Sequence, residues 1–230
     1  MNKGVLYGVG VGPGDPELMT LKAVRAIREN GVIAVPGRDP ERSLAYRIAV
    51  RAVPEAADKI LIPLEMPRIN VRGRREESHR AAAGKILDHL RQGRNVVFLT
   101  LGDPAIYSTF PYLASAVREA GFRSEMVSGV PSYCAAAAAL DISLTEWDEP
   151  MHVIPVLYGT DSLQDLRGTV VLMKAGKQLR ENGLQLEAAG KTVLSVEHCG
   201  LPDEKRFSGA EELPENTGYF TLMIAKEASS

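Results

Sequence analysis

Short apolar runs rich in β-branched residues alternate along the chain with longer stretches of helical periodicity. The apolar runs predict strands, because alternating or continuous apolar residues over four to eight positions are typical of sheets. The run that begins at Asn95 is apolar throughout, as in a strand buried on both faces of a parallel sheet. The expected strands are residues 4–11, 32–36, 59–64, 95–103, 123–131, 151–159, 168–176, 191–200 and 218–227.

The stretches between these runs predict helices. They are residues 16–30, 43–53, 75–93, 110–121 and 132–142. In the first, Leu18, Leu21, Val24 and Ile27 fall on one face of a helix. Asp15 is its expected N-cap, and Gly31 is a suitable stop signal.

Strands that alternate with helices at this interval predict an α/β fold with a mainly parallel sheet. The pattern changes after residue 142, where a polar stretch contains the single tryptophan, Trp147, and strands then follow with less helix between them. We therefore expect two α/β domains, 1–146 and 147–230, the second with a mixed sheet. The connection at 177–190 is short for a parallel crossover, which predicts either an antiparallel arrangement there or missing residues.

Composition restricts the function classes. The formal net charge is −2, so no overall basic surface suggests a nucleic-acid partner. Cys134 and Cys199 are far apart and form no zinc or disulfide framework, and the four histidines have no metal-ligand spacing. The sequence contains no secretion signal and no apolar run long enough to cross a membrane. These observations predict a soluble cytoplasmic protein without a metal.

The glycine-rich turn after the first strand, Gly8 to Ala23, does not match a phosphate-binding loop. Pro13 stands where the third glycine of a dinucleotide fingerprint belongs, and the lysine of a P-loop is missing. Two further turns of small residues, 100–109 and 128–139, follow later strands. Such turns at the carboxyl ends of parallel strands gather at one sheet edge, where α/β proteins bind ligands. The turns therefore predict a ligand cleft without identifying the ligand.

The motifs Gly-Val-Gly-Pro-Gly-Asp-Pro-Glu-Leu-Met-Thr-Leu-Lys-Ala, Phe-Leu-Thr-Leu-Gly-Asp-Pro-Ala-Ile-Tyr-Ser-Thr and Ser-Gly-Val-Pro-Ser-Tyr-Cys-Ala, in this order, resemble the tetrapyrrole (corrin/porphyrin) methylases. The resemblance extends through Val-Val-Leu-Met-Lys-Ala-Gly and covers most of the chain. Residues 43–49, 75–86 and 99–110 resemble most the subgroup of precorrin-2 or cobalt-factor II C20-methyltransferases. The resemblance implies two α/β domains with an active-site cleft between them, S-adenosylmethionine as methyl donor, and a homodimer.

The resemblance also implies a set of site residues. Donor-binding positions would be Leu101, Gly102, Asp103, Tyr107, Ser132, Met173, Lys174 and Ala175. The first turn, with Pro13 and Gly14, would face the macrocycle. Asp103 and Asp15 are candidate bases or orienting groups for the proton that leaves after methyl transfer, although Asp15 is equally suited to a capping role.

The substrate of such an enzyme carries eight carboxylates, which arginine pairs with well. Arg72, Arg74 and Arg75, within a cluster that also holds Arg68 and Arg80, are therefore candidate substrate-binding residues, with a solvated surface as the alternative. Two other functions stay open: methylation of a similar macrocycle at another position, and a non-catalytic tetrapyrrole-binding domain. The sequence does not distinguish a cobalt-containing substrate from a cobalt-free one.

Overall fold

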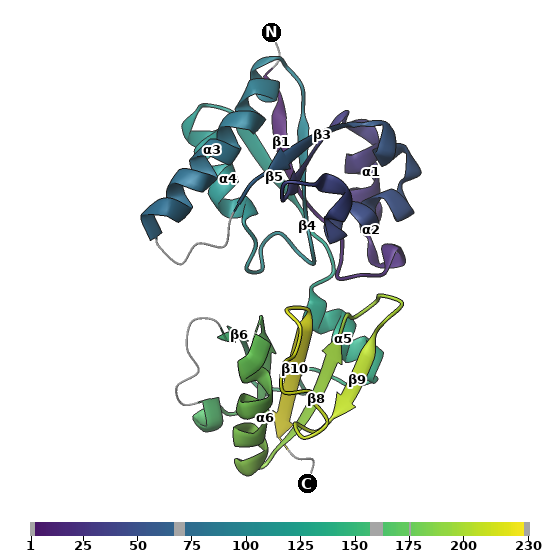
Figure 1. Cartoon of the computed structure of the whole chain (residues 1–230), viewed down its shortest axis with the longest axis vertical. Coiled ribbons are helices and arrows are strands. Elements are labelled where there is room, and N and C mark those ends of the chain that lie inside the picture. The colour runs from purple at the N-terminus through teal and green to yellow at the C-terminus, as the bar shows by residue number, and fades with distance from the viewer. Residues whose placement is uncertain (1–2, 67–71, 157–162, 175, 228–230) are drawn as a thin grey trace. The chain divides into compact units, whose positions relative to one another are not determined.

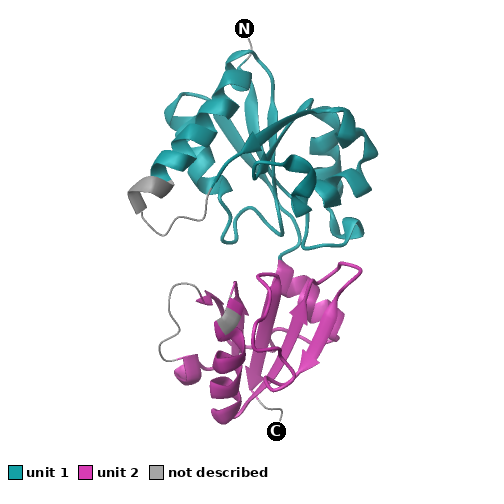
Figure 2. Ribbon diagram, viewed as in Figure 1, with its two compact units in different colours: residues 1–131 teal, residues 132–230 magenta. Residues whose placement is uncertain are grey.

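The chain forms two compact units, residues 1–131 and 132–230, which are coloured separately in Figure 2. The computed structural model describes residues 3–66, 72–156, 163–174 and 176–227, and only the backbone of residues 72–75 and 177. The change of sequence pattern at Trp147 lies within the second unit. The unit begins earlier because the alanine-rich helix α5 (Ser132–Leu140) packs its Ala136 and Ala137 against strands of that unit.

The first unit is a parallel five-stranded sheet with helices on both faces (Figure 1). Its strand order is β3-β2-β4-β1-β5. The strands are β1 (Val5–Gly10), β2 (Val32–Pro36), β3 (Ile60–Leu64), β4 (Val96–Thr100) and β5 (Arg123–Val127). Val96 to Leu99 are buried, as the continuous apolar run predicts for a strand covered on both sides.

Two helices cover each face of this sheet. Helices α1 (Leu21–Glu29) and α2 (Leu44–Ala52) contribute Ile27 and Ile48 to one apolar cluster. Helices α3 (Arg72–Arg91) and α4 (Phe110–Glu119) contribute Ile86 and Leu113 to another. Short 3-10 helices at Pro16–Leu18, Pro40–Arg42 and Pro54–Asp58 complete the connections.

The first helix begins later than the sequence pattern predicts. Asp15 caps the 3-10 turn, since its Oδ1 accepts the N–H of Glu17 at 2.9 Å. The N-cap of α1 is Thr20, whose Oγ1 accepts the N–H of Ala23 at 3.1 Å. The buried face of α1 carries Ala23 and Ile27, and Leu21 is 87% exposed. The prediction that Leu21 belongs to the buried face was wrong.

The second unit has a mixed sheet with the strand order β6-β7-β10-β8-β9. Its strands are β6 (Met151–Pro155), β7 (Thr169–Met173), β8 (Lys191–Glu197), β9 (Lys205–Ser208) and β10 (Thr221–Glu227). Helix α5 covers one face of this sheet, and α6 (Leu179–Ala188) packs its Leu179 and Leu186 on the other face. Short 3-10 helices lie at Leu163–Asp165 and Gly176–Gln178. The polar strand β9 was not expected, because no apolar run marks it.

The connection between β7 and β8 is a complete crossover. Both strands are antiparallel to β10, which lies between them, so β7 and β8 are parallel to each other. Residues 174–190, which include α6, join them. The expected antiparallel arrangement was therefore wrong: the two strands are parallel, and the ten-residue helix α6 lies in the crossover between them. None of the helices in the described ranges has the length and hydropathy that a membrane crossing requires.

An ion pair between a buried lysine and a half-exposed glutamate connects strands at one end of the second sheet. The Lys191 side chain is 2% exposed, and its Nζ donates to Glu227 Oε1 at 2.7 Å and to the carbonyl of Gly168 at 2.9 Å. Glu227 Oε1 also accepts the N–H of Gly168 at 2.8 Å. The hydrogen bond from Lys191 and the one from Gly168 hold the pKa of the Glu227 carboxyl below its usual range.

We expect this pair to make the protein sensitive to acid. A carboxyl whose pKa is lowered by folding stabilises the folded state above its unfolded pKa, and that contribution is lost as pH falls through the folded pKa. Glu227→Gln should therefore lower the melting temperature at pH 7, and the difference from the wild type should shrink as the pH falls through the lowered pKa of Glu227 and the wild type loses the charge. Thermal unfolding of both proteins across this range measures the difference; equal melting temperatures at pH 7 would contradict the role given to the pair.

Candidate functional site

The three small-residue turns meet at one edge of the first sheet. Strand β1 lies between β4 and β5, and all three run parallel, so the turns that follow them are neighbours. Beyond the strands, Val11 N–H donates to the carbonyl of Thr100 at 3.0 Å. Gly12 and Gly102 then form an isolated antiparallel bridge, in which Gly102 N–H donates to the Gly12 carbonyl at 2.9 Å. We call this edge, with its turns 11–20, 101–109 and 128–131, the carboxyl edge.

Glycines let the three turns approach each other at van der Waals distance. A Cβ atom on Gly10 would lie 2.5 Å from the carbonyl oxygen of Gly102 and 2.7 Å from the nitrogen of Gly129. A Cβ on Gly129 would lie 2.2 Å from the same oxygen of Gly102. These distances are too short for any side chain. The glycines at positions 10 and 129 are therefore required for contact between turns.

Asp103 joins the second turn to the third. Its Oδ1 accepts the N–H of Ala105 at 2.7 Å, and its Oδ2 accepts the N–H of Gly129 at 3.0 Å. Both carboxylate oxygens thus hold backbone, one within the turn and one across it. This arrangement supports the orienting role predicted for Asp103 more directly than a role as base.

Thr20 provides a second link between turns. Besides capping α1, its hydroxyl donates to the carbonyl of Ser128 at 3.1 Å, which connects the first turn to the third. Pro13 is half-buried and Gly14 is buried in this first turn, ahead of the capping carboxylate of Asp15. The edge is therefore a hydrogen-bonded unit of three backbone segments.

The second turn has an irregular backbone at the predicted donor-binding positions. Gly102 has φ 65° and Tyr107 has φ 47°, and the Tyr107 side chain is 45% exposed. Leu101 is half-buried at the end of β4. Non-glycine residues with positive φ are strained and are frequent at functional sites. The hydroxyls of Thr100 and Ser108, 3.1 Å apart, close the turn.

The charge of the carboxyl edge suits a cationic ligand. Its turns contain Asp15, Glu17 and Asp103, and no lysine, arginine or histidine. A phosphate would meet net negative charge here, whereas a sulfonium would be attracted by it. The donor S-adenosylmethionine carries such a sulfonium, so these residues fit it better than a nucleotide phosphate.

The other predicted donor-binding residues belong to the second unit. Ser132 is the first residue of α5, Met173 ends β7, and Lys174 follows it with φ 55°. Met173 and Tyr133, the neighbour of Ser132, pack against one apolar cluster. Ala175 lies outside the described residues. Met173 and Lys174 thus stand at the carboxyl end of β7, a position analogous to that of Leu101 and Gly102 after β4.

The predicted substrate-binding arginines stand at the start of α3. This helix begins at Arg72 and includes Arg74 and Arg75, whose side chains lie outside the described residues, as Arg68 does entirely. Because α3 follows β3, its first turn is on the carboxyl side of the parallel sheet. The backbone therefore puts the start of α3 on the carboxyl side of the sheet, and the role of the three arginines in substrate binding stays a prediction.

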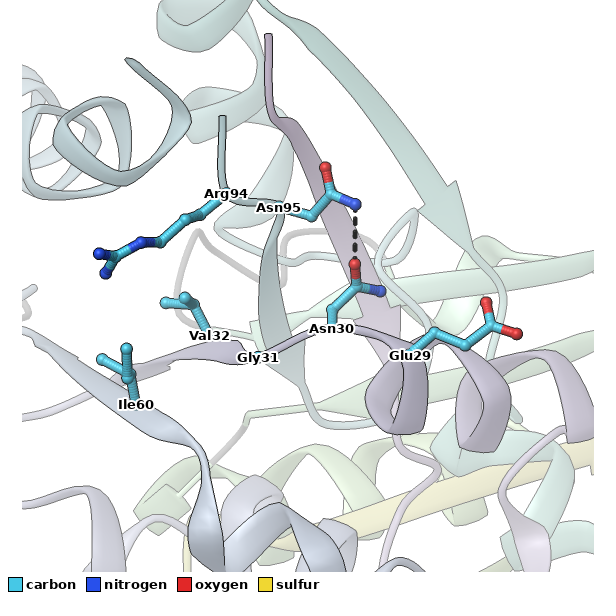
Figure 3. A pocket seen from close by; sticks show the side chains of 7 residues that line it. All are labelled: Glu29, Asn30, Gly31, Val32, Ile60, Arg94 and Asn95. Carbon is cyan, nitrogen blue, oxygen red and sulfur yellow. Dashed lines mark hydrogen bonds between the residues drawn. The ribbon is translucent and has the colours of Figure 1, made fainter. Parts of the chain in front are cut away.

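A hollow in the first unit lies at the opposite edge of the sheet, where the strands begin. Figure 3 shows Asn30 and Asn95 turned toward each other there, and Asn95 Nδ2 donates to Asn30 Oδ1 at 2.9 Å. Asn95 Oδ1 also accepts the N–H of Val5 at 2.9 Å, and Asn30 Nδ2 donates to the carbonyl of Ala26. These amides bind one another and the backbone, so the hollow is a structural feature remote from the carboxyl edge.

Some residues of the edge were not predicted from the sequence. Thr20 has the signature of an N-cap, a threonine before an apolar helix, but the proline at 16 suggested an earlier start. The contact between Asp103 and Gly129 spans 26 residues and follows only from the strand order. In the second unit, His198 pairs with Asp203, and an H-x4-D spacing alone would not have identified them.

Comparison with known proteins identifies the family. The family model of the tetrapyrrole (corrin/porphyrin) methylases matches residues 5–214. The chain is 33% identical to a probable cobalt-precorrin-2 C(20)-methyltransferase of Methanocaldococcus jannaschii over 98% of each chain, and 29% identical to a precorrin-2 C(20)-methyltransferase of Sinorhizobium sp over 96% of this chain and 94% of the relative.

A solved structure of uroporphyrin-III C-methyltransferase from Thermus thermophilus, complexed with S-adenosylhomocysteine, has the same fold. The two structures superimpose with a TM-score of 0.70 at 24% sequence identity, and the match covers 97% of this chain and 98% of the Thermus thermophilus chain. The parallel sheet, the mixed sheet and the match over residues 5–214 agree with the fold expected from the sequence motifs. The chain belongs to the tetrapyrrole (corrin/porphyrin) methylase family.

Proposed function

We propose that this protein transfers the methyl group of S-adenosylmethionine to carbon 20 of precorrin-2 or of its cobalt complex, in cobalamin biosynthesis. The observation that carries the proposal is similarity over nearly the whole chain to two C(20)-methyltransferases, one named for the cobalt complex and one for precorrin-2. A relative named as a cobalt-precorrin-4 C(11)-methyltransferase is 29% identical over 87% of this chain, so position on the ring is what an assay must determine.

The carboxyl edge of the first sheet supports the donor half of this reaction. The sulfonium of S-adenosylmethionine supplies an activated methyl group, and the chain's own part is to hold donor and acceptor carbon in line. Orientation of this kind contributes roughly 7–11 kcal/mol to lowering a barrier. The bridge between Gly12 and Gly102 and the two hydrogen bonds that Asp103 accepts tie the second turn to the first and third, which supports such an orienting role.

In this proposal Leu101, Gly102 and Tyr107 bind the donor from the first unit, and Ser132, Met173, Lys174 and Ala175 bind it from the second. Pro13 and Gly14 contact the macrocycle. We also propose that the protein is a cytoplasmic homodimer; the free thiols of Cys134 and Cys199 are consistent with a reducing compartment. Light scattering after size-exclusion chromatography would measure the oligomeric state.

Replacement of Arg72, Arg74 and Arg75 together by alanine should raise the substrate KM tenfold to a hundredfold, about 1.4–2.8 kcal/mol, because carboxylates of the substrate lose their partners. The affinity for S-adenosylhomocysteine should not change. The defect should shrink at high salt, where the wild type loses the same attraction. Replacing Arg25, Arg28 and Arg47 is a matched control, since these arginines belong to α1 and α2 on the other face. If the variant lacking Arg72, Arg74 and Arg75 has the KM of the wild type at low salt, these arginines belong to the solvated surface.

The proposed function is tested by incubating the protein with S-adenosylmethionine carrying a carbon-13 methyl group and, separately, with reduced precorrin-2 and with its cobalt complex. Carbon NMR of the product should show one new methyl group on carbon 20. The substrate that is methylated faster shows whether the enzyme acts on the macrocycle with or without cobalt. A methyl group at another carbon would support a different regiospecificity, and stoichiometric binding without turnover would support a tetrapyrrole carrier.

A further inference from the structure

The carboxyl ends of β7 and β8, in the second unit, form an edge that holds a histidine paired with an aspartate. The Nδ1 atom of His198 lies 2.6 Å from Oδ2 of Asp203, and the His198 side chain is 31% exposed. The bond from His198 holds the pKa of the Asp203 carboxyl below its usual range, so this carboxyl is ionised at neutral pH. The carboxylate oxygen can only accept a hydrogen bond, so the proton between the two groups lies on Nδ1, and Nε2 is the ring nitrogen that remains for exchange of a proton.

The histidine is held in a fixed position. His198 has φ 54°, its N–H donates to the carbonyl of Phe220 at 3.1 Å, and its ring lies 5.9 Å from the Phe220 ring. The following turn is closed by Glu204, which accepts the N–H of Gly200 at 2.7 Å. A strained histidine oriented by a carboxylate is an arrangement that proteins maintain at functional sites.

Strand register places this pair near the donor-binding positions of the proposed function. Thr221 pairs with Glu197 across β10 and β8, and Met223 pairs with Leu172 across β10 and β7. Continued by two residues, the second register sets Lys174 level with Thr221. His198 therefore leaves the sheet two strand spacings, about 10 Å, from Lys174 on the same edge.

The other candidate proton acceptors of the described site residues are engaged. Asp103 and Asp15 accept backbone N–H groups, as does Glu197, whose Oε1 also faces the Thr221 hydroxyl. Burial, with a smaller effect of Glu204, raises the pKa of the Cys199 thiol to about 11, so it stays protonated. His198, whose Nδ1 is held by Asp203, is therefore our candidate base at this edge.

We propose that Nε2 of His198 accepts the proton that leaves the methylated ring carbon, with Asp203 as its positioning residue; this inference rests on the proposed function. The electron pair of the ring forms the new C–C bond while the S–C bond of the donor breaks and its electrons stay on sulfur. The C–H bond of the same ring carbon then breaks, its electron pair returns to the macrocycle, and the proton moves to Nε2. The imidazolium, stabilised by Asp203, releases this proton to water.

His198→Ala should lower kcat about a hundredfold or more, as expected for loss of a general base. Added imidazole should restore part of the rate, and the affinity for S-adenosylhomocysteine should stay within twofold of wild type. Asp203→Asn should lower kcat less and should not respond to imidazole, while Asp203→Glu should recover activity. His152→Ala is the matched control, because His152 pairs with Val170 on β7, away from this edge, and contacts the carbonyl of Arg167.

The outcomes separate this inference from the proposed function. If the wild type methylates carbon 20 and His198→Ala does so at the wild-type rate, the inference is wrong and the function stands. If His198→Ala binds S-adenosylhomocysteine more weakly but keeps the wild-type kcat, His198 binds the donor and its role as base is overturned. If His198→Ala is unfolded by circular dichroism, Asp203→Asn decides: an unchanged kcat there contradicts the proposal. A wild type that methylates neither substrate overturns both.

Discussion

Gly129→Ala is expected to lower the free energy of unfolding of the first unit by about 3 kcal/mol and to abolish measurable donor binding. The added Cβ would lie 2.2 Å from the carbonyl oxygen of Gly102 and 2.8 Å from the carbonyl carbon of Gly10. Backbone on both sides cannot move away as a flexible side chain would. The second and third turns must therefore separate, and the edge loses the geometry that the donor requires.

Urea unfolding and calorimetric titration with S-adenosylhomocysteine measure the two effects. Gly31→Ala is the matched control, since a Cβ there meets no atom within 4 Å and Gly31 is exposed. Gly84→Ala, within α3 and equally free of contacts, should even stabilise the protein by about 1 kcal/mol. If Gly129→Ala unfolds at the same urea concentration as Gly31→Ala, the turns do not pack as the structure has them.

Asp103→Ala should weaken donor binding at least tenfold and destabilise the first unit by about 2–3 kcal/mol, because two backbone N–H groups lose a charged acceptor. Asp103→Asn should have an intermediate effect, since its amide retains one acceptor oxygen and places an NH2 group against the other N–H. The affinity for S-adenosylhomocysteine and the midpoint of urea unfolding are the quantities to compare.

The control for Asp103 is an aspartate in a similar local role elsewhere. Asp39 caps the 3-10 helix Pro40–Arg42, where its Oδ1 accepts the N–H of Glu41 at 3.1 Å. Asp39→Ala should cost about 1 kcal/mol of stability, as for other lost caps, and leave donor affinity unchanged. Equal effects of Asp39→Ala and Asp103→Ala on donor affinity would show that Asp103 acts through general stability alone.

Most strands and helices of the first unit follow from the sequence because local pattern and packing agree there. The run from Val96 to Leu99 is apolar and fully buried, and its strand begins within a residue of the expected position. Leu21 illustrates the limit of periodicity. Ala23 and Ile27, one turn apart, define the buried face, and Leu21 stands two residues before Ala23, about 200° around the helix. Leu21 and Ile27 are themselves about 120° apart, so a spacing of three residues repeated along the chain drifts off the buried face.

The second unit was harder to predict because its strands are paired over long distances. Strand β9 is exposed and polar, with Lys205 and Arg206 at its start, so no hydrophobic signal marks it. The crossover from β7 to β8 passes the intervening strand β10 and contains the ten-residue helix α6. For the site, the sequence pattern predicts which turns follow buried strands. It does not predict the contacts of Asp103 with Gly129 and of His198 with Asp203, because these depend on side-chain directions that residue spacing does not specify.

The position of β10 has a consequence for the order in which the protein acquires structure during synthesis. All five strands of the first sheet have been translated by Val127, so this unit has its complete set of strands early. The second sheet is divided until the ribosome reaches Glu227, because the last strand made is the central one and both β7 and β8 expose an unpaired edge before then. A nascent chain stalled before Thr221 should therefore resist protease only over its first 131 residues, and such stalled chains should be the ones that associate with chaperones or with each other.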